Sequence, residues 1–170
     1  QEVVVEGDQT VAEFAGLAGE QGGEGTGVEV LHFDPDQLDD LSDFIVSLDI
    51  PVVIDHMARL SADDFGGAWC DAFLDLMRHP GIWTKISGAE RGSLTGPPFT
   101  DMLPIVHALA DVAEDRLLWG TDWPHPVLTR PMPDDGALVD LLAEMLPEPA
   151  RRARVLVDNP ARLYGFPPVA

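Results

Sequence analysis

Four short apolar runs, each followed by a stretch of helical spacing, limit what this chain can fold into more than any other feature. The runs cover residues 28–33, 51–55, 82–86 and 117–119. The second is continuously apolar, as a strand covered on both faces should be. Strands that recur at intervals of roughly 30 residues, each with a helix after it, are typical of a parallel sheet. We therefore predict an α/β fold with parallel strands.

Apolar residues at helical spacing place the helices between and after these runs. One helix is expected from about residue 34 to residue 47, and another stops at Pro80, with Trp69, Phe73, Leu76 and Met77 on one buried face. Further helices are predicted over about 99–113, 134–145 and 148–157, and residues 159–164 are expected to form a terminal turn.

The N-terminal segment has a different character. Residues 3–5 predict a short strand, and Thr10 is predicted to cap a helix over residues 11–18, with Glu13 completing a capping box. Five glycines between residues 19 and 27 indicate a flexible connection. We therefore expect residues 1–27 to be a poorly ordered segment with a glycine-rich linker, and residues 28–170 to form one domain.

The charge balance restricts the partners. A formal net charge of −20 disfavours nucleic acid and anionic membrane surfaces. The apolar runs are too short to span a bilayer, and the first residues show no signal-peptide pattern. The single cysteine, Cys70, excludes an internal disulfide and is expected to be a small buried helix residue, so a cytoplasmic location is predicted. An anionic substrate would need local cations, and nine of the ten cationic residues are arginines.

Polar residues stand where three of the predicted strands end. They are His56, Arg91 and Asp122, and His32 lies near the end of its own strand. If the strands are parallel neighbours, these side chains converge on one rim, which is where barrels of alternating strands and helices place their chemistry. Taken singly, each has a plainer interpretation: a turn or N-cap aspartate, a hydrogen-bonded core histidine, or an arginine that holds a loop.

Other polar residues are interpreted as structural. In a regular strand Asp55 would point to the face opposite His56, and Arg59 would form a surface ion pair or bind a ligand. His125 lies between two prolines and is expected to shape its loop. Two histidines are assigned to helices and three arginines to a solvated helix face: His79, His107, Arg151, Arg152 and Arg154. No HxH, HExxH or paired CxxC pattern supports a self-contained metal site, and no GxSxG or Walker loop occurs.

Four segments together resemble the amidohydrolase-related family of TIM-barrel hydrolases, and most closely its 2-pyrone-4,6-dicarboxylate hydrolase branch. They are VIDHMAR at 53–59, KISGAER at 85–91, WGTDWPH at 119–125 and VDNPARLYGF at 157–166, in the family's order. The resemblance extends over roughly residues 28–166. It implies a cytoplasmic enzyme of aromatic compound degradation, a lactonase that hydrolyses a small anionic lactone or dicarboxylate without a metal.

The resemblance also assigns roles to particular residues. Asp122 takes the place of the general base that activates water, and His56 that of the histidine that polarises the lactone carbonyl. Arg59 and Arg91 correspond to the arginines that bind the substrate carboxylates. His32 stands where the family usually has a tyrosine near the substrate. A base for water and donors for the developing oxyanion are what lactone hydrolysis requires.

The chain departs from the family at its beginning. It lacks the HxH strand with which the family begins and the arginines usually found on a strand just before Val28, and a complete barrel takes about 250 residues. We therefore expect an incomplete TIM-type barrel, the C-terminal half to two-thirds, from a truncated or rearranged gene. Two alternatives remain open: a zinc-dependent amidohydrolase or decarboxylase with His56 and Asp122 as ligands, or an inactive fragment whose exposed strand edges pair it with a second copy or another half.

Overall fold

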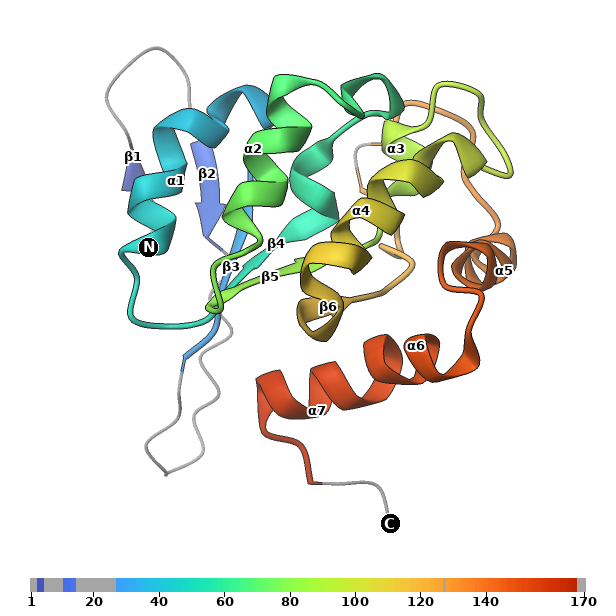
Figure 1. Cartoon of the computed structure of the whole chain (residues 1–170). Helices are drawn as coiled ribbons and strands as arrows, with labels where there is room; N and C mark the ends of the chain where they lie inside the picture. Colours follow the sequence, from blue (N-terminus) through green and yellow to red (C-terminus); the bar gives the residue numbers. More distant parts are fainter. Residues whose placement is uncertain (1–2, 5–10, 15–26, 127, 168–170) are drawn as a thin grey trace.

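A computed structural model describes residues 3–4, 11–14, 27–126 and 128–167. Six strands form one sheet in chain order (Figure 1). They are β1 (Val3–Val4), β2 (Val11–Phe14), β3 (Glu29–His32), β4 (Val52–Ile54), β5 (Ile82–Lys85) and β6 (Leu117–Leu118). The helices are α1 (Leu38–Val46), α2 (Ala68–Leu76), α3 (Ala89–Gly92), α4 (Leu103–Ala113), α5 (Asp135–Met145), α6 (Pro149–Ala153) and α7 (Asn159–Tyr164).

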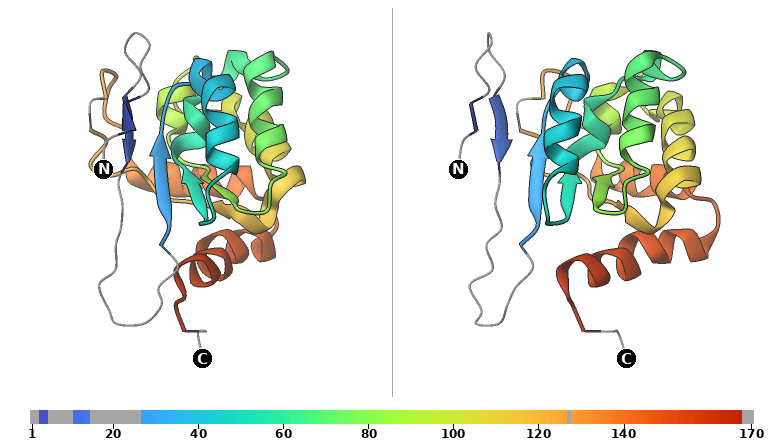
Figure 2. Two further views of the ribbon diagram at one scale, coloured as in Figure 1. Left: turned by 90° about the vertical axis from the view of Figure 1, so that its left-hand side faces the viewer. Right: turned by 60° about the vertical axis from the view of Figure 1, so that its left-hand side comes forward.

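The four strands from β3 to β6 are parallel, as predicted. Val30 pairs with Val53, and Val53 pairs with Trp83 on the next strand. Figure 2 shows α1, α2 and α4 side by side over one face of this sheet, while α6 and α7 cross beneath it at the end where β3 begins. The sheet remains open, so the expectation of an α/β fold that forms part of a barrel is confirmed.

The helix predicted for residues 11–18 is wrong where the structure describes this segment. Residues 11–14 form β2, which pairs antiparallel with β3 and places Phe14 opposite Leu31. Pairing along the free edge of β3 satisfies backbone groups of both segments, and Val11 and Phe14 favour strands, which outweighs a local capping box. The strand expected at residues 3–5 is present as Val3–Val4. Residues 15–18 and most of the glycine-rich segment lie outside the described part, and the division at residue 27 stays a prediction.

Two apolar clusters lie on the two faces of the sheet. The larger lies between the sheet and the helices and includes Phe73, Met77 and Ile105 among its fully buried side chains. The smaller lies on the opposite, concave face, where Val30, Val53, Trp83 and Leu118 are closed over by Leu163 of α7. Alternate strand residues therefore serve the two faces, and the concave face is the one that a closed barrel would turn inward.

The helices match the prediction in most places and differ in α2 and α6. Cys70 is buried in α2 as expected, but Trp69 is 44% exposed instead of facing the core, because Cys70 occupies the inward position next to it. Arg151 is not simply solvated: its Nε donates to Glu114 Oε2 at 2.5 Å, and Arg154 pairs with the same carboxylate. The predicted terminal turn is the helix α7.

The remaining helix ends follow the sequence signals. Asp134 is the N-cap of α5, and its side chain accepts a hydrogen bond from the backbone of Ala137 at 3.0 Å. A short 3₁₀ turn precedes α4, and a π-helical turn joins α6 to α7. Within the described residues, every helix falls short of the length and hydropathy that crossing a bilayer requires.

Candidate active site

An acid, an imidazole and a guanidinium meet at the carboxyl ends of the parallel strands. His56, just after β4, places Nε2 3.3 Å from Oδ1 of Asp122, in the loop after β6. The other carboxylate oxygen of Asp122 accepts from Arg91 of α3, at 2.9 Å from Nε and 2.5 Å from Nη2. The ring of His32 stands edge-on to that of His56, with centroids 5.5 Å apart. The structure thus brings together four of the five residues that the sequence proposed for the site.

The fifth, Arg59, lies at the outer edge of this group. Its Nη1 forms an ion pair with Asp34 Oδ1 at 2.9 Å, and its side chain is 43% exposed. The Arg59 charge still reaches the site, because after burial it is the largest influence that lowers the pKa of His32. The ion-pair partner of Arg59 is thus Asp34, and Arg59 lies apart from the contacts that join His56, Asp122 and Arg91.

A left-handed run of backbone positions His56. β4 ends at Ile54, and His56, Met57, Ala58 and Arg59 then take φ values of 51°, 54°, 52° and 56°. Non-glycine residues seldom adopt positive φ, and each such residue costs about 1–3 kcal/mol unless its surroundings enforce it. Met57 and Ala58 are fully buried, so core packing holds the run in place. Asp122 also has a positive φ, of 69°. His56 and Asp122 therefore both lie on strained backbone.

Several residues of the site were missed in the sequence. Asp55 was assigned to the face opposite His56, but the strand ends before it, and Asp55 Oδ1 lies 2.6 Å from Nζ of Lys85. Lys85 shares the concave face with Trp83, two residues before it, and is the chain's only lysine. Side chains alternate between the two faces along a strand, and this alternation could have placed Lys85 near the site.

A second group of side chains secures the loop that carries Asp122. His125 is 3% exposed, with Nδ1 3.4 Å from Glu90 Oε1 and Nε2 3.2 Å from Asp135 Oδ1. Its backbone nitrogen donates to the carbonyl of Asp122 at 2.7 Å. Arg91 Nη2 also donates to the carbonyl of Pro126, at 3.0 Å. The expectation that His125 shapes its loop fits this geometry, and the loop is tied to both α3 and α5.

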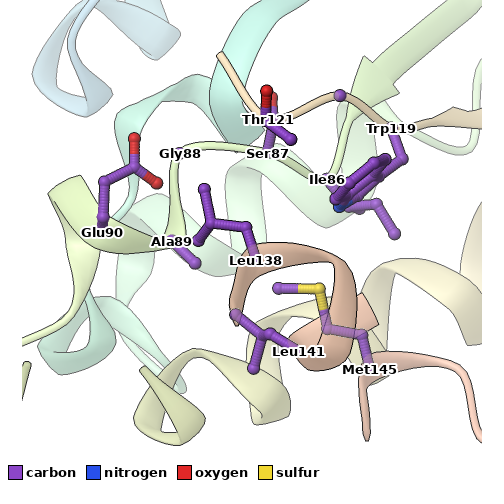
Figure 3. A pocket seen from close by; sticks show the side chains of 11 residues that line it. Ile86, Ser87, Gly88, Ala89, Glu90, Trp119, Thr121, Leu138, Leu141 and Met145 are labelled. Atoms are coloured by element: carbon purple, nitrogen blue, oxygen red, sulfur yellow. The ribbon is translucent and has the colours of Figure 1, made fainter. Parts of the chain in front are cut away.

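A small pocket lies behind the rim, between the ends of β5 and β6 and the helix α5 (Figure 3). Leu138, Leu141 and Met145 supply its apolar wall. Ser87 and Thr121 also line it, and both carry hydroxyl groups. Ser87 is 4% exposed, and its Oγ lies 2.8 Å from Nδ1 of His56. Both ring nitrogens of His56 therefore have a partner.

Two histidines of the rim, His32 and His56, have lowered pKa values. Burial lowers the pKa of His56 below its usual 6.5, against the opposing effect of the Asp122 and Asp55 charges. Burial, with help from Arg59, also lowers the pKa of His32. Since desolvation penalises the charged form, both rings are neutral at pH 7. A neutral imidazole has one N–H to donate and one nitrogen that accepts.

Two groups of side chains have ligand atoms close enough to share a cation. The first group is His32, Asp55 and His56, and the second is Glu90, Asp122 and His125. Within each group the ligand atoms lie within 4.8 Å of one another. A cation of the protein already faces the carboxylates of each group: Lys85 faces Asp55, and Arg91 faces both Glu90 and Asp122. A divalent ion would be repelled by that cation or would have to displace it.

Comparison with known proteins gives consistent matches. The sequence model of the family described as amidohydrolase matches residues 24–166. A 4-sulfomuconolactone hydrolase of Rhizobium radiobacter is 44% identical over 138 residues, which cover 79% of this chain and 46% of that protein. A 2-pyrone-4,6-dicarboxylate hydrolase of Comamonas testosteroni is 39% identical over 150 residues, with coverage of 79% and 48%. The chain thus spans about half the length of the curated relatives it matches.

Solved structures match in the same way. A protein of Agrobacterium tumefaciens, solved in its apo form, superposes with a TM-score of 0.71 at 30% identity over 84% of this chain and 52% of that one. An amidohydrolase of Burkholderia multivorans with bound zinc superposes with a TM-score of 0.63 at 25% identity, with coverage of 82% and 53%.

Proposed function

Because this chain belongs to the amidohydrolase family, we propose that it is a hydrolase of carboxylated lactones such as 2-pyrone-4,6-dicarboxylate. The observation that carries the proposal is the contact of Asp122 with both His56 and Arg91 at one rim of the sheet. The names of the two relatives, which act on an anionic sulfonated lactone and on a pyrone dicarboxylate, support the substrate class. The substrate of this chain is thus proposed to be a small anion.

In the proposed reaction Asp122 takes a proton from water as the water oxygen attacks the lactone carbonyl carbon. His56 donates its Nε2–H to the carbonyl oxygen, where negative charge develops, and removal of such a donor typically costs about 2.7–4 kcal/mol of barrier. The carbonyl then re-forms as the ring C–O bond breaks, and the ring oxygen takes up the proton that Asp122 removed from water, to give the open hydroxy acid or its keto form.

The cations of the rim account for binding. Arg91 holds Asp122 in place through two hydrogen bonds. A substrate carboxylate can take the place of Asp122 at part of the Arg91 guanidinium, which would free a carboxylate oxygen of Asp122 to act as the base. Arg59, Lys85 and Arg91 together supply three of the ten cationic residues of the chain. Each of the three already faces a carboxylate of the chain, so a substrate carboxylate would bind by taking the place of one of them. The wider field of a protein with net charge −20 is screened over about 8 Å at physiological salt.

We propose that this reaction needs no metal, since Lys85 and Arg91 already balance the carboxylates that a metal would use. The zinc-bound amidohydrolase from Burkholderia multivorans supports the alternative, a metal-dependent reaction. Elemental analysis of the purified chain, with assays before and after chelation, separates the two. Stoichiometric zinc together with loss of activity on chelation would favour the alternative.

The direct test is ring opening of 2-pyrone-4,6-dicarboxylate by the purified chain, followed by the ultraviolet absorbance of the pyrone. Asp122→Asn, which keeps the shape and removes the base, is the matched control. Turnover by the wild type that the variant lacks supports the proposal. A folded wild type without turnover would contradict it and would favour a partner role for the open sheet, which sedimentation would reveal as self-association. A cytoplasmic location stays a prediction.

A further inference from the structure

Ser87 contacts the one nitrogen of His56 that the proposed reaction does not use. It follows β5, and its Oγ lies 2.8 Å from Nδ1 of His56. The opposite nitrogen, Nε2, faces Oδ1 of Asp122 at 3.3 Å. A continuous line of contacts therefore runs from the Ser87 hydroxyl through the imidazole to the carboxylate.

The directions of these hydrogen bonds follow from the groups themselves. The Asp122 carboxylate, paired with the Arg91 guanidinium, can only accept, so Nε2 must carry the proton that lies between them. A neutral imidazole has a single N–H, which leaves Nδ1 as an acceptor. The Ser87 hydroxyl, which can rotate, is then the donor to Nδ1. The other tautomer would set two lone pairs against each other at Nε2 and Oδ1.

The chain is built for close contact at this position. Gly88, next to Ser87, has a φ of 73°, and a Cβ added there would lie 3.0 Å from Cβ and 3.3 Å from Nδ1 of His56. Only glycine therefore lets this segment approach the imidazole so closely. Ser87 is itself 4% exposed, so water does not readily replace its hydroxyl.

We propose that Ser87 is a positioning residue that fixes His56 in the tautomer with the proton on Nε2. A hydroxyl that donates to Nδ1 favours the neutral ring, and it keeps the N–H directed to the side where Asp122 lies. The inference rests on the proposed function, in which this same N–H polarises the lactone carbonyl. Ser87 therefore acts through His56 and not on the substrate.

The arrangement differs from a Ser–His–Asp nucleophilic triad. In such a triad the serine contacts the nitrogen opposite the one held by the aspartate, and its oxygen is open to the substrate. Here the serine does contact the opposite nitrogen, but its oxygen is buried, while the aspartate is the more accessible end, at 14% side-chain exposure. The roles are therefore reversed: the serine orients the ring, and the aspartate faces the reacting water.

The test is nitrogen NMR of protein labelled with ¹⁵N-histidine, with the His56 signals identified by their loss in His56→Gln. In the wild type at pH 7 we expect Nδ1 to be unprotonated and Nε2 to carry the proton. In Ser87→Ala we expect a shifted Nδ1 signal with admixture of the other tautomer, a raised pKa of His56, and a kcat about 2- to 10-fold lower at similar KM. Ser87→Thr, which keeps the hydroxyl, should retain the wild-type signals, and Ser87→Cys, a weaker donor, should give signals between those of the wild type and Ser87→Ala.

A proton on Nδ1 in the wild type would overturn the inference, as would an unchanged His56 spectrum and pKa in folded Ser87→Ala. The NMR readout needs no substrate. If the signals behave as expected and the protein opens no lactone, the positioning role stands and the proposed function fails.

Discussion

The face of the sheet that the helices cover contrasts sharply with the rim at the carboxyl ends of its strands. Along their length, and on the face beneath α1, α2 and α4, the strands bury aliphatic and aromatic side chains in ordinary backbone conformations. At their carboxyl ends the chain takes positive φ at residues without glycine's freedom, and it sets carboxylates, imidazoles and guanidinium groups against one another. Stability is built on the covered face, and this stability supports the strain at the rim.

This contrast makes a first prediction, with the largest expected effect. Asp122→Asn removes the base at the rim and should lower kcat by about 10²- to 10⁴-fold, while the urea midpoint stays within the range of ordinary surface changes. Steady-state kinetics and urea unfolding of the same preparation measure both. A large loss of stability with little loss of kcat would show that Asp122 supports the fold and does not take part in the reaction.

The complementary change lies in the core. Phe73→Ala in α2 removes a fully buried ring and should lower the free energy of unfolding by about 3–5 kcal/mol. The rate per folded molecule should change little at temperatures where the variant is folded. Urea unfolding followed by circular dichroism gives the first quantity, and kinetics corrected for the folded fraction gives the second. A selective loss of kcat in fully folded Phe73→Ala would break the contrast.

A pair of glycines separates backbone strain from contact with the site. Gly88 and Gly66 have nearly equal φ values of 73° and 75°, but a Cβ at Gly66 would meet nothing within 4 Å, whereas one at Gly88 would meet His56. Each change to alanine should cost about 1–2 kcal/mol of stability from the left-handed backbone. Only Gly88→Ala should also displace His56 and lower kcat. Equal effects of the two changes on the rate would show that the close approach at Gly88 is unimportant.

The smallest expected effect concerns pH. Burial lowers the pKa of His56 in the folded state, so below pH 6.5 the unfolded chain binds a proton that the folded chain resists. Stability should therefore decrease as the pH falls below 6.5, with a slope of at most about 1.4 kcal/mol per pH unit from this residue. His56→Gln should flatten the curve between pH 6.5 and 5. An unchanged slope would mean that burial of His56 has no net effect on stability.

The covered face was predictable from the sequence, and the rim only in part. Apolar periodicity placed the four parallel strands and most helices, because it depends on local spacing. The same reasoning brought His32, His56, Arg91 and Asp122 to one rim, because parallel strands end at a common edge. It failed for Asp55 and His56, since it assumed a regular strand where β4 ends at Ile54 and the backbone is left-handed from His56 onward.

The remaining differences have long-range causes. The segment of β2 was predicted as a helix because a capping signal depends only on neighbouring residues. Its partner strand β3 lies about 20 residues away and does not change that signal. The contacts of Ser87 with His56, and of His125 with Glu90 and Asp135, join separate βα units. No local pattern in a single sequence reports such contacts.

The central claim is that His56 and Asp122 act as one unit on the lactone, and a double-mutant cycle tests it most directly. The kcat/KM for ring opening of 2-pyrone-4,6-dicarboxylate is measured for the wild type, His56→Gln, Asp122→Asn and the double variant. If the two residues act together, removing either one abolishes their joint effect on the rate. The double variant should then be about as slow as the slower single variant. Losses that multiply in the double variant would show that the two residues act independently, and would contradict the account.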